Sequence, residues 1–89
     1  MKLTDVLKRN PAAAHQSVGE EAIIINLNTS TYYSLNDTGT VFWELIDGQR
    51  TIADCAAAIA REYEVAAAEV EADLLELAEE FQQEGLVFV

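Results

Sequence analysis

Residues 19–48 limit the possible folds most, because they predict a β-hairpin that runs directly into a helix. Residues 22–27 contain three consecutive isoleucines, and a short apolar run of this kind is typical of a strand with both faces at least partly covered. Turn formers occupy 28–30, and residues 31–35 are rich in the β-branched and aromatic types that favour strands. Two strands around so short a turn predict a hairpin.

Capping residues predict where the first two helices begin and end. Asn36 suits the N-cap of a first helix, and Gly48 suits its C′ position. Thr51 and Asp54 match a capping box, with Asp in place of Glu, for a second helix. The apolar face of that second helix is predicted to consist of Ile52, Cys55, Ala56, Ile59 and Tyr63.

The remaining segments complete the predicted order of elements. Helical periodicity predicts a third helix over 66–84, which Gly85 ends, and residues 86–89 are typical of a short terminal strand. Residues 13–18 are expected to form a strand before the hairpin, with 19–21 as the turn between them.

This order, β-β-β-α-α-α-β, predicts an α+β fold of winged-helix-like type. In it a three-stranded antiparallel sheet is followed by three helices, and the second and third helices form a helix-turn-helix arrangement. We expect one domain over residues 13–89, preceded by a flexible N-terminal arm over residues 1–12, because Pro11 disfavours helix in the residue before it.

The net charge of −11 on 89 residues restricts the kinds of partner. Such a surface repels phosphate backbones and anionic lipids, which argues against nucleic acid and membrane and favours a neutral or basic peptide or protein. A DNA-reading role for the third helix is further disfavoured, because residues 66–84 hold seven acidic and no basic residues. The N-terminus lacks the apolar core of a signal peptide, so we expect a cytoplasmic location.

Residues that could support catalysis are few. Cys55 is the only cysteine, so it can form neither an internal disulfide nor a cysteine zinc site, and it is expected to pack in the core. His15 stands alone in its segment. We therefore expect no catalytic residues, no metal, no cofactor and no enzymatic activity.

Two neighbouring features suggest a groove for a peptide. Glu69, Asp73, Glu76 and Glu80 recur on one side of the third helix, beside an apolar stripe of Val70, Leu74, Leu77 and Phe81. The acids form either a solvated face or one wall of a groove for a basic peptide. The strand over 31–35 would form the other wall, because an unpaired strand edge can accept another strand. Tyr33 and Leu35 share one face of that strand and Tyr32 and Ser34 the other, and either tyrosine could meet a ligand.

The chain also resembles PqqD-like proteins, which are leader-peptide recognition domains of ribosomal peptide modification pathways. The matching features are Glu20-Glu21-Ala22, Tyr32-Tyr33-Ser34-Leu35-Asn36, Gly39, Trp43-Glu44-Leu45-Ile46-Asp47-Gly48, Thr51, Asp73-Leu74-Leu75 and Gly85-Leu86. The resemblance implies a winged-helix-like fold in which the leader segment of a precursor peptide adds as a strand and lies against the third helix. The implied peptide-binding residues are Thr31, Tyr32, Tyr33, Ser34, Leu35, Val70, Asp73, Leu74, Glu76, Leu77 and Glu80.

The resemblance further implies a protein that delivers its leader to a modifying enzyme. The pattern Asn-Thr-x-x-Tyr-Tyr-x-Leu-Asn, residues 28–36, is similar to the stand-alone lasso-peptide type, whose partner is a leader peptidase. The alternatives are a PqqD-type chaperone for a radical SAM enzyme and a general interaction or dimerisation module. If the chain is a leader-binding adaptor, we expect the acidic stripe of the third helix to select leaders that carry Lys or Arg.

Overall fold

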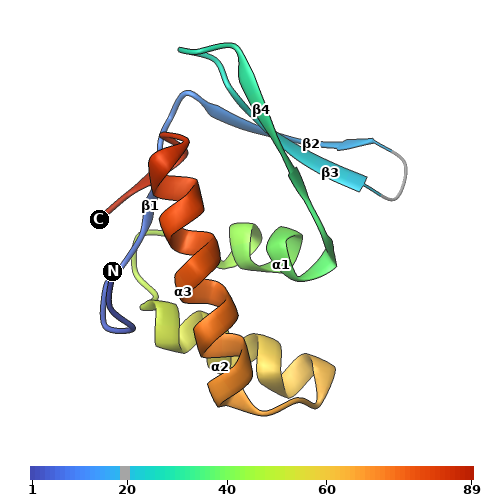
Figure 1. Cartoon of the computed structure of the whole chain (residues 1–89), viewed down its shortest axis with the longest axis vertical. Coiled ribbons are helices and arrows are strands. Elements are labelled where there is room, and N and C mark those ends of the chain that lie inside the picture. Colours follow the sequence, from blue (N-terminus) through green and yellow to red (C-terminus); the bar gives the residue numbers. More distant parts are fainter. Residues whose placement is uncertain (19–20) are drawn as a thin grey trace.

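The computed structural model describes residues 1–18 and 21–89 and has the predicted α+β architecture (Figure 1). The turn expected at 19–21 lies largely outside the described residues. None of the helices in the described residues is long and apolar enough to cross a membrane. The elements are β1 (Lys8–Arg9), β2 (Ala13–Val18), β3 (Glu21–Asn26), β4 (Thr31–Leu35), α1 (Asp37–Leu45), α2 (Ile52–Tyr63), α3 (Ala67–Gln83) and β5 (Val87–Phe88).

The strands β2, β3 and β4 form an antiparallel sheet in that order. The β3–β4 hairpin closes at the pair Asn26 and Thr31, so the turn comprises four residues and includes Leu27, which the sequence had placed in the strand. The N–H of Ser30 donates to the carbonyl of Asn26 over 2.8 Å, and Ser30 itself is left-handed, with φ of 60°. This geometry closes a four-residue loop without a glycine.

The two faces of the sheet have different environments. Ile24 in β3 is fully buried, and its partner in β4 is Tyr33, so Tyr33 points toward the helices. Tyr32 points to the opposite face and is 72 % exposed. The structure thereby settles which tyrosine faces the helices, a question that the sequence left open.

Helix α1 begins where predicted and ends earlier than predicted. The side chain of Asn36 accepts the N–H of Gly39 over 2.7 Å, as an N-cap does. The expected C′ position of Gly48 is wrong, because the C-cap is Ile46 and Asp47 therefore occupies C′. A carboxylate oxygen of Asp47 accepts the backbone N–H groups of Gln49 and Arg50. These bonds lower the pKa of Asp47 and start a turn in which Gly48 is left-handed.

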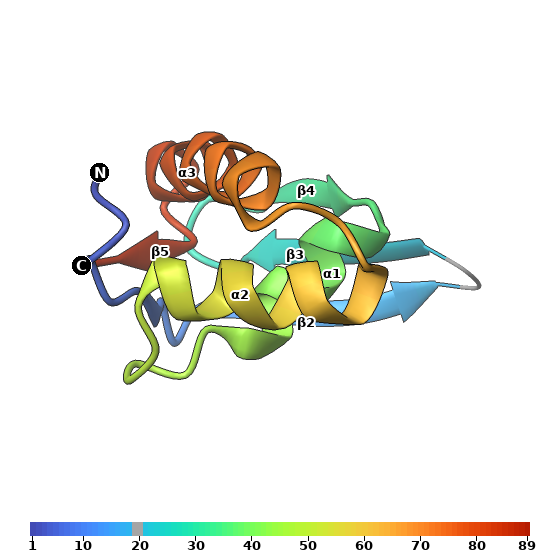
Figure 2. The ribbon, with the colours of Figure 1, turned by 90° about the horizontal axis from the view of Figure 1, so that it is seen from below.

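Helices α2 and α3 pack against each other, as the helix-turn-helix prediction requires (Figure 2). The predicted capping box of α2 is present, since Thr51 and Asp54 exchange hydrogen bonds of 3.0 and 3.1 Å. Tyr63, expected on the apolar face of α2, is the last residue of that helix and is 43 % exposed. Helix α3 begins after Ala66, which makes no side-chain cap bond.

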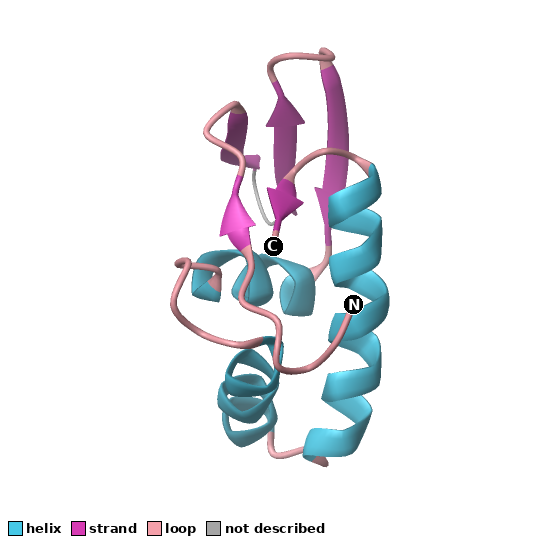
Figure 3. Ribbon diagram, turned by 90° about the vertical axis from the view of Figure 1, so that its left-hand side faces the viewer, coloured by secondary structure: helices cyan, strands magenta, loops and turns pink. Residues whose placement is uncertain are grey.

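The core is made of buried side chains from the sheet and all three helices, among them Ile24, Phe42, Ile59 and Phe81. Helix α1 lies between the sheet and α2, and α3 runs along all of them (Figures 1 and 3). Phe81 of α3 is fully buried, and its ring lies 5.5 to 5.9 Å from the rings of Tyr33, Phe42 and Trp43. This aromatic cluster fixes α3 beside β4, which positions the site described below.

The N-terminal segment differs from the flexible arm expected over residues 1–12. Strand β1 pairs with β5, Leu7 is only 2 % exposed, and the guanidinium of Arg9 lies 5.0 Å from the ring centroid of Trp43 and donates to its carbonyl. The expectation rested on the local effect of Pro11. The terminal strand β5 needs a partner, however, and β1 provides that partner from the other end of the chain.

Candidate functional site

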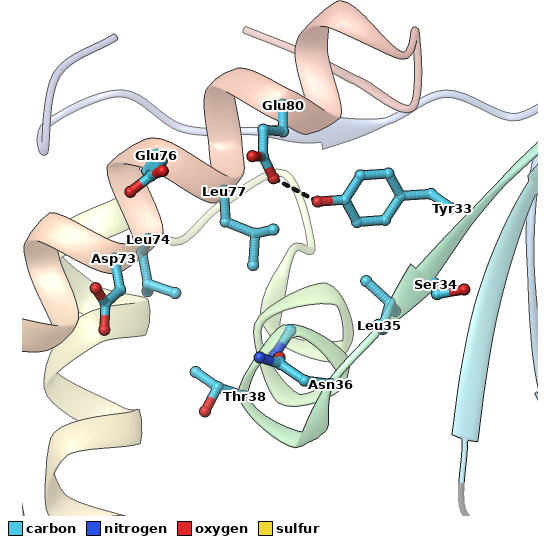
Figure 4. A pocket seen from close by; sticks show the side chains of 11 residues that line it. Tyr33, Ser34, Leu35, Asn36, Thr38, Asp73, Leu74, Glu76, Leu77 and Glu80 are labelled. Atoms are coloured by element: carbon cyan, nitrogen blue, oxygen red, sulfur yellow. Dashed lines mark hydrogen bonds between the residues drawn. The ribbon is translucent and has the colours of Figure 1, made fainter.

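A groove of about 500 Å³ lies between β4 and α3, with the start of α1 at one side (Figure 4). We call it the β4–α3 groove. It is lined by Tyr33, Ser34, Leu35, Asn36, Thr38, Gly39, Asp73, Leu74, Glu76, Leu77 and Glu80. Strand β4 contributes one wall and α3 the other, so the groove forms where a strand edge and a helix run side by side.

The outer edge of β4 is open. Strand β4 is the last strand of the sheet, and among the residues that the structure describes no strand pairs with its other side. The edge carries no proline, lysine or arginine, which are the residues that often protect such edges. Its unpaired backbone groups are therefore accessible at the mouth of the groove.

The register identifies which backbone groups these are. Leu27 donates its N–H toward β2, to the carbonyl of Ala12 over 2.9 Å, so Asn26, one residue earlier, directs its backbone groups toward β4. Because backbone groups alternate sides along an antiparallel strand, every second residue of β4 bonds to β3. The residues between them, Tyr32 and Ser34, direct their N–H and C=O groups outward.

Tyr33 and Glu80 close one end of the groove. The Tyr33 hydroxyl donates to the Glu80 carboxylate, which joins β4 to α3 (Figure 4). Burial, this hydrogen bond and the negative charges of Glu80 and Glu84 raise the pKa of Tyr33 to about 12. The ring of Phe81 packs against the same ring in an edge-to-face arrangement. The hydroxyl therefore stays protonated and keeps donating throughout the physiological range.

The groove combines an apolar floor with an acidic rim. Leu35 and Leu74 are buried and Leu77 is half-buried, so they form an apolar base. Asp73 and Glu76 are exposed on the α3 side, closer to the N-terminus of the helix than the Tyr33 contact at Glu80. Neither has a salt-bridge partner among the described residues. The arrangement suits an extended chain with apolar and cationic side chains.

Eight of the eleven residues implied by the resemblance line the groove, and three do not. Thr31 is the exposed first residue of β4, Tyr32 points to the other face of the sheet, and Val70 is buried in the core. The sequence reasoning missed Asn36, Thr38 and Gly39. The signal for these residues was the Asn36 helix cap. Because α1 starts directly after the edge strand β4, its first turn must lie beside the β4–α3 groove. Contact of any of these residues with a peptide stays a prediction.

The chemically reactive side chains lie outside the groove. Cys55 is buried in α2, and burial raises the pKa of its thiol to about 11, so the reactive thiolate is disfavoured. His15 is exposed on β2. In residues 1–18 and 21–89 no group of three His, Cys, Asp or Glu side chains could hold a metal ion.

Comparison with known proteins relates this architecture to solved structures. A structure described as TbiB1 in complex with the TbiA(β) leader peptide superposes with a TM-score of 0.80 at 26 % identity, covering 90 % of this chain and 93 % of that one. A lasso peptide synthetase B1 complexed with the leader peptide gives 0.83 at 20 % identity, covering 96 % and 100 %, and this likeness concerns the fold.

A search of curated proteins gave no match. The sequence profile of the family described as coenzyme PQQ synthesis protein D (PqqD) matches residues 21–87, which include β3, β4 and all three helices. The family resemblance noted in the sequence is thereby confirmed. The chain belongs to the PqqD family.

Proposed function

We propose that this chain is a non-catalytic adaptor that binds the leader segment of a ribosomally synthesised precursor peptide and presents it to a modifying enzyme. The observation that carries the proposal is the open edge of β4 beside the β4–α3 groove. The likeness to TbiB1, whose structure is a complex with a leader peptide, supports it.

The binding mode follows from the direction of the backbone groups. A leader in extended conformation adds to β4 by pairing with the N–H and C=O groups of Tyr32 and Ser34. These four groups would form up to four hydrogen bonds, each with a net worth of about 0.5–1.5 kcal/mol. Every second leader side chain then points into the groove, where the side chains of α3 determine which sequences fit.

The proposed partner enzyme is a leader peptidase of a lasso-peptide pathway. The support is the resemblance of residues 28–36 to the stand-alone lasso type. The second candidate is a chaperone for a radical SAM enzyme, which the family description as coenzyme PQQ synthesis protein D favours. Adding the leader-bound chain to each purified enzyme separates the two, because only the true partner is stimulated.

The binding mode is tested by titrating the fluorescently labelled leader of the precursor encoded beside this chain. Ser34→Pro removes an outward N–H and leaves the bonds between β3 and β4 in place, since proline is tolerated on the free side of an edge strand. We expect the affinity to fall by about tenfold to a hundredfold, because the leader carbonyl that this N–H would serve is left without a donor, at a cost of about 1–3 kcal/mol. Ser34→Ala is the matched control, because it keeps the N–H, and its affinity should change less than about twofold.

Two outcomes would contradict the proposal. Equal affinity of Ser34→Pro and the unchanged chain, with both folded by circular dichroism, would exclude strand addition. A stable dimer in sedimentation that the leader does not dissociate would favour the dimerisation module instead, because the open edge would then serve a second copy.

A further inference from the structure

We infer that the β4–α3 groove selects leaders with a Lys or Arg whose side chain crosses the apolar floor and ends between Asp73 and Glu76. This rests on the proposed function and makes it more specific. It replaces a general attraction by the whole acidic stripe of α3 with recognition by two carboxylates at one end of the groove.

The shape of the groove fits a side chain with an aliphatic stem and a charged tip. Leu35, Leu74 and Leu77 form an apolar floor against which a stem of three or four methylene groups packs. Asp73 and Glu76 stand three residues apart on α3, so their carboxylates lie on one side of the helix. A cation that reaches across the floor therefore arrives between two negative charges.

The other acids of the stripe are less suited to this task. Glu80 already accepts the hydroxyl of Tyr33, at the end of the groove that this contact closes. Glu69 lies in the first turn of α3, outside the groove lining. Asp73 and Glu76 are the two acids of the lining that remain without a donor among the described residues.

Within residues 1–18 and 21–89, no lysine or arginine forms a salt bridge with Asp73 or Glu76. Arg9 lies over Trp43 and Arg50 pairs with Asp47. No lysine or arginine lines the groove. An apolar or acidic leader side chain that covers these carboxylates removes their hydrating water and leaves their negative charges unpaired, which is unfavourable. A basic side chain instead pairs with these charges. The five basic residues of the whole chain are Lys2, Lys8, Arg9, Arg50 and Arg61.

The test begins with a display library of random twelve-residue peptides, selected on the full-length chain. We expect selected peptides to share one position enriched in Lys or Arg. Selection on Asp73→Asn/Glu76→Gln should lose that enrichment. The control Glu62→Gln/Glu69→Gln removes two exposed charges outside the groove and should retain it.

Resynthesised peptides then measure the effect directly. Replacing the selected basic residue by norleucine keeps the stem and removes the charge. On the unchanged chain we expect the affinity to fall by about tenfold, and on Asp73→Asn/Glu76→Gln by less than about twofold. A similar loss on both proteins would overturn the inference.

The failure of the inference and the failure of the proposed function give different results. Selected peptides that lose binding to Ser34→Pro and lack a preferred basic position leave strand addition standing and refute the role of Asp73 and Glu76. Selected peptides that bind Ser34→Pro as well as the unchanged chain refute strand addition itself, and with it the inference.

Discussion

Asn26 is the polar side chain that connects the hairpin to the end of α3, and its removal tests how the groove is held together. It is only 3 % exposed. Its Nδ2 donates to the carbonyl of Glu84 over 3.1 Å, and its Oδ1 accepts the N–H of Asn28 over 3.0 Å. A Cβ atom on Gly85 would approach Nδ2 to 3.1 Å, so the two segments are closely packed.

We predict that Asn26→Ala lowers the free energy of unfolding by about 2–3 kcal/mol. Two hydrogen bonds with a net worth of roughly 0.5–1.5 kcal/mol each give 1–3 kcal/mol, and the part-buried carbonyl of Glu84 left without this donor moves the value toward the upper end. Because Asn26 joins the hairpin to the C-terminal end of α3, its loss should let the two groove walls shift relative to each other, and leader affinity should also fall.

Urea denaturation followed by far-ultraviolet circular dichroism measures the change, with leader titration as the second readout. The matched control is Asn28→Ala, which keeps the backbone N–H that Asn26 accepts and should stay within about 0.5 kcal/mol of the unchanged chain. A loss for Asn26→Ala no greater than that of Asn28→Ala would refute the structural role assigned to this side chain.

Three further predictions concern stability. As the folded-state pKa of Tyr33, about 12, exceeds the ordinary value of 10.0, its contribution is complete below pH 10 and is lost as pH rises toward 12; Tyr33→Phe should flatten this part of the stability profile in urea melts. Leu7→Ala should cost about 2–3 kcal/mol in the same melts, whereas a mobile arm would give no change. Thr51→Ala should cost about 1 kcal/mol by removing the capping box, and Thr51→Ser, which keeps a hydroxyl acceptor, should cost far less.

Local signals in the sequence predicted most of the fold. The hairpin, the Asn36 cap and the Thr51 capping box depend on residues within a few positions of one another, and the structure contains all three. The end of α1 was placed too late, because the side chain of Asp47 starts a turn before Gly48 is reached.

Features that depend on distant partners could not be predicted in the same way. The pairing of β1 with β5 joins opposite ends of the chain, and nothing near Pro11 indicates it. The face on which each tyrosine lies was hidden by residues 23–25, because three consecutive isoleucines show no alternation that would identify the buried side. Only the register, with Ile24 opposite Tyr33, decides that question.

The contact between Tyr33 and Glu80 has a mechanical consequence. Together with the bond from Asn26 to Glu84, it ties the sheet to the C-terminal half of α3, whereas the N-terminal half of that helix packs on α2. The separation of the two groove walls is thus fixed near Tyr33. Among the described residues no hydrogen bond or salt bridge joins β4 to α3 near Asp73. We therefore expect guest residues near Tyr33 to meet walls of fixed separation, and bulkier guest residues to be accepted toward the N-terminal end of α3.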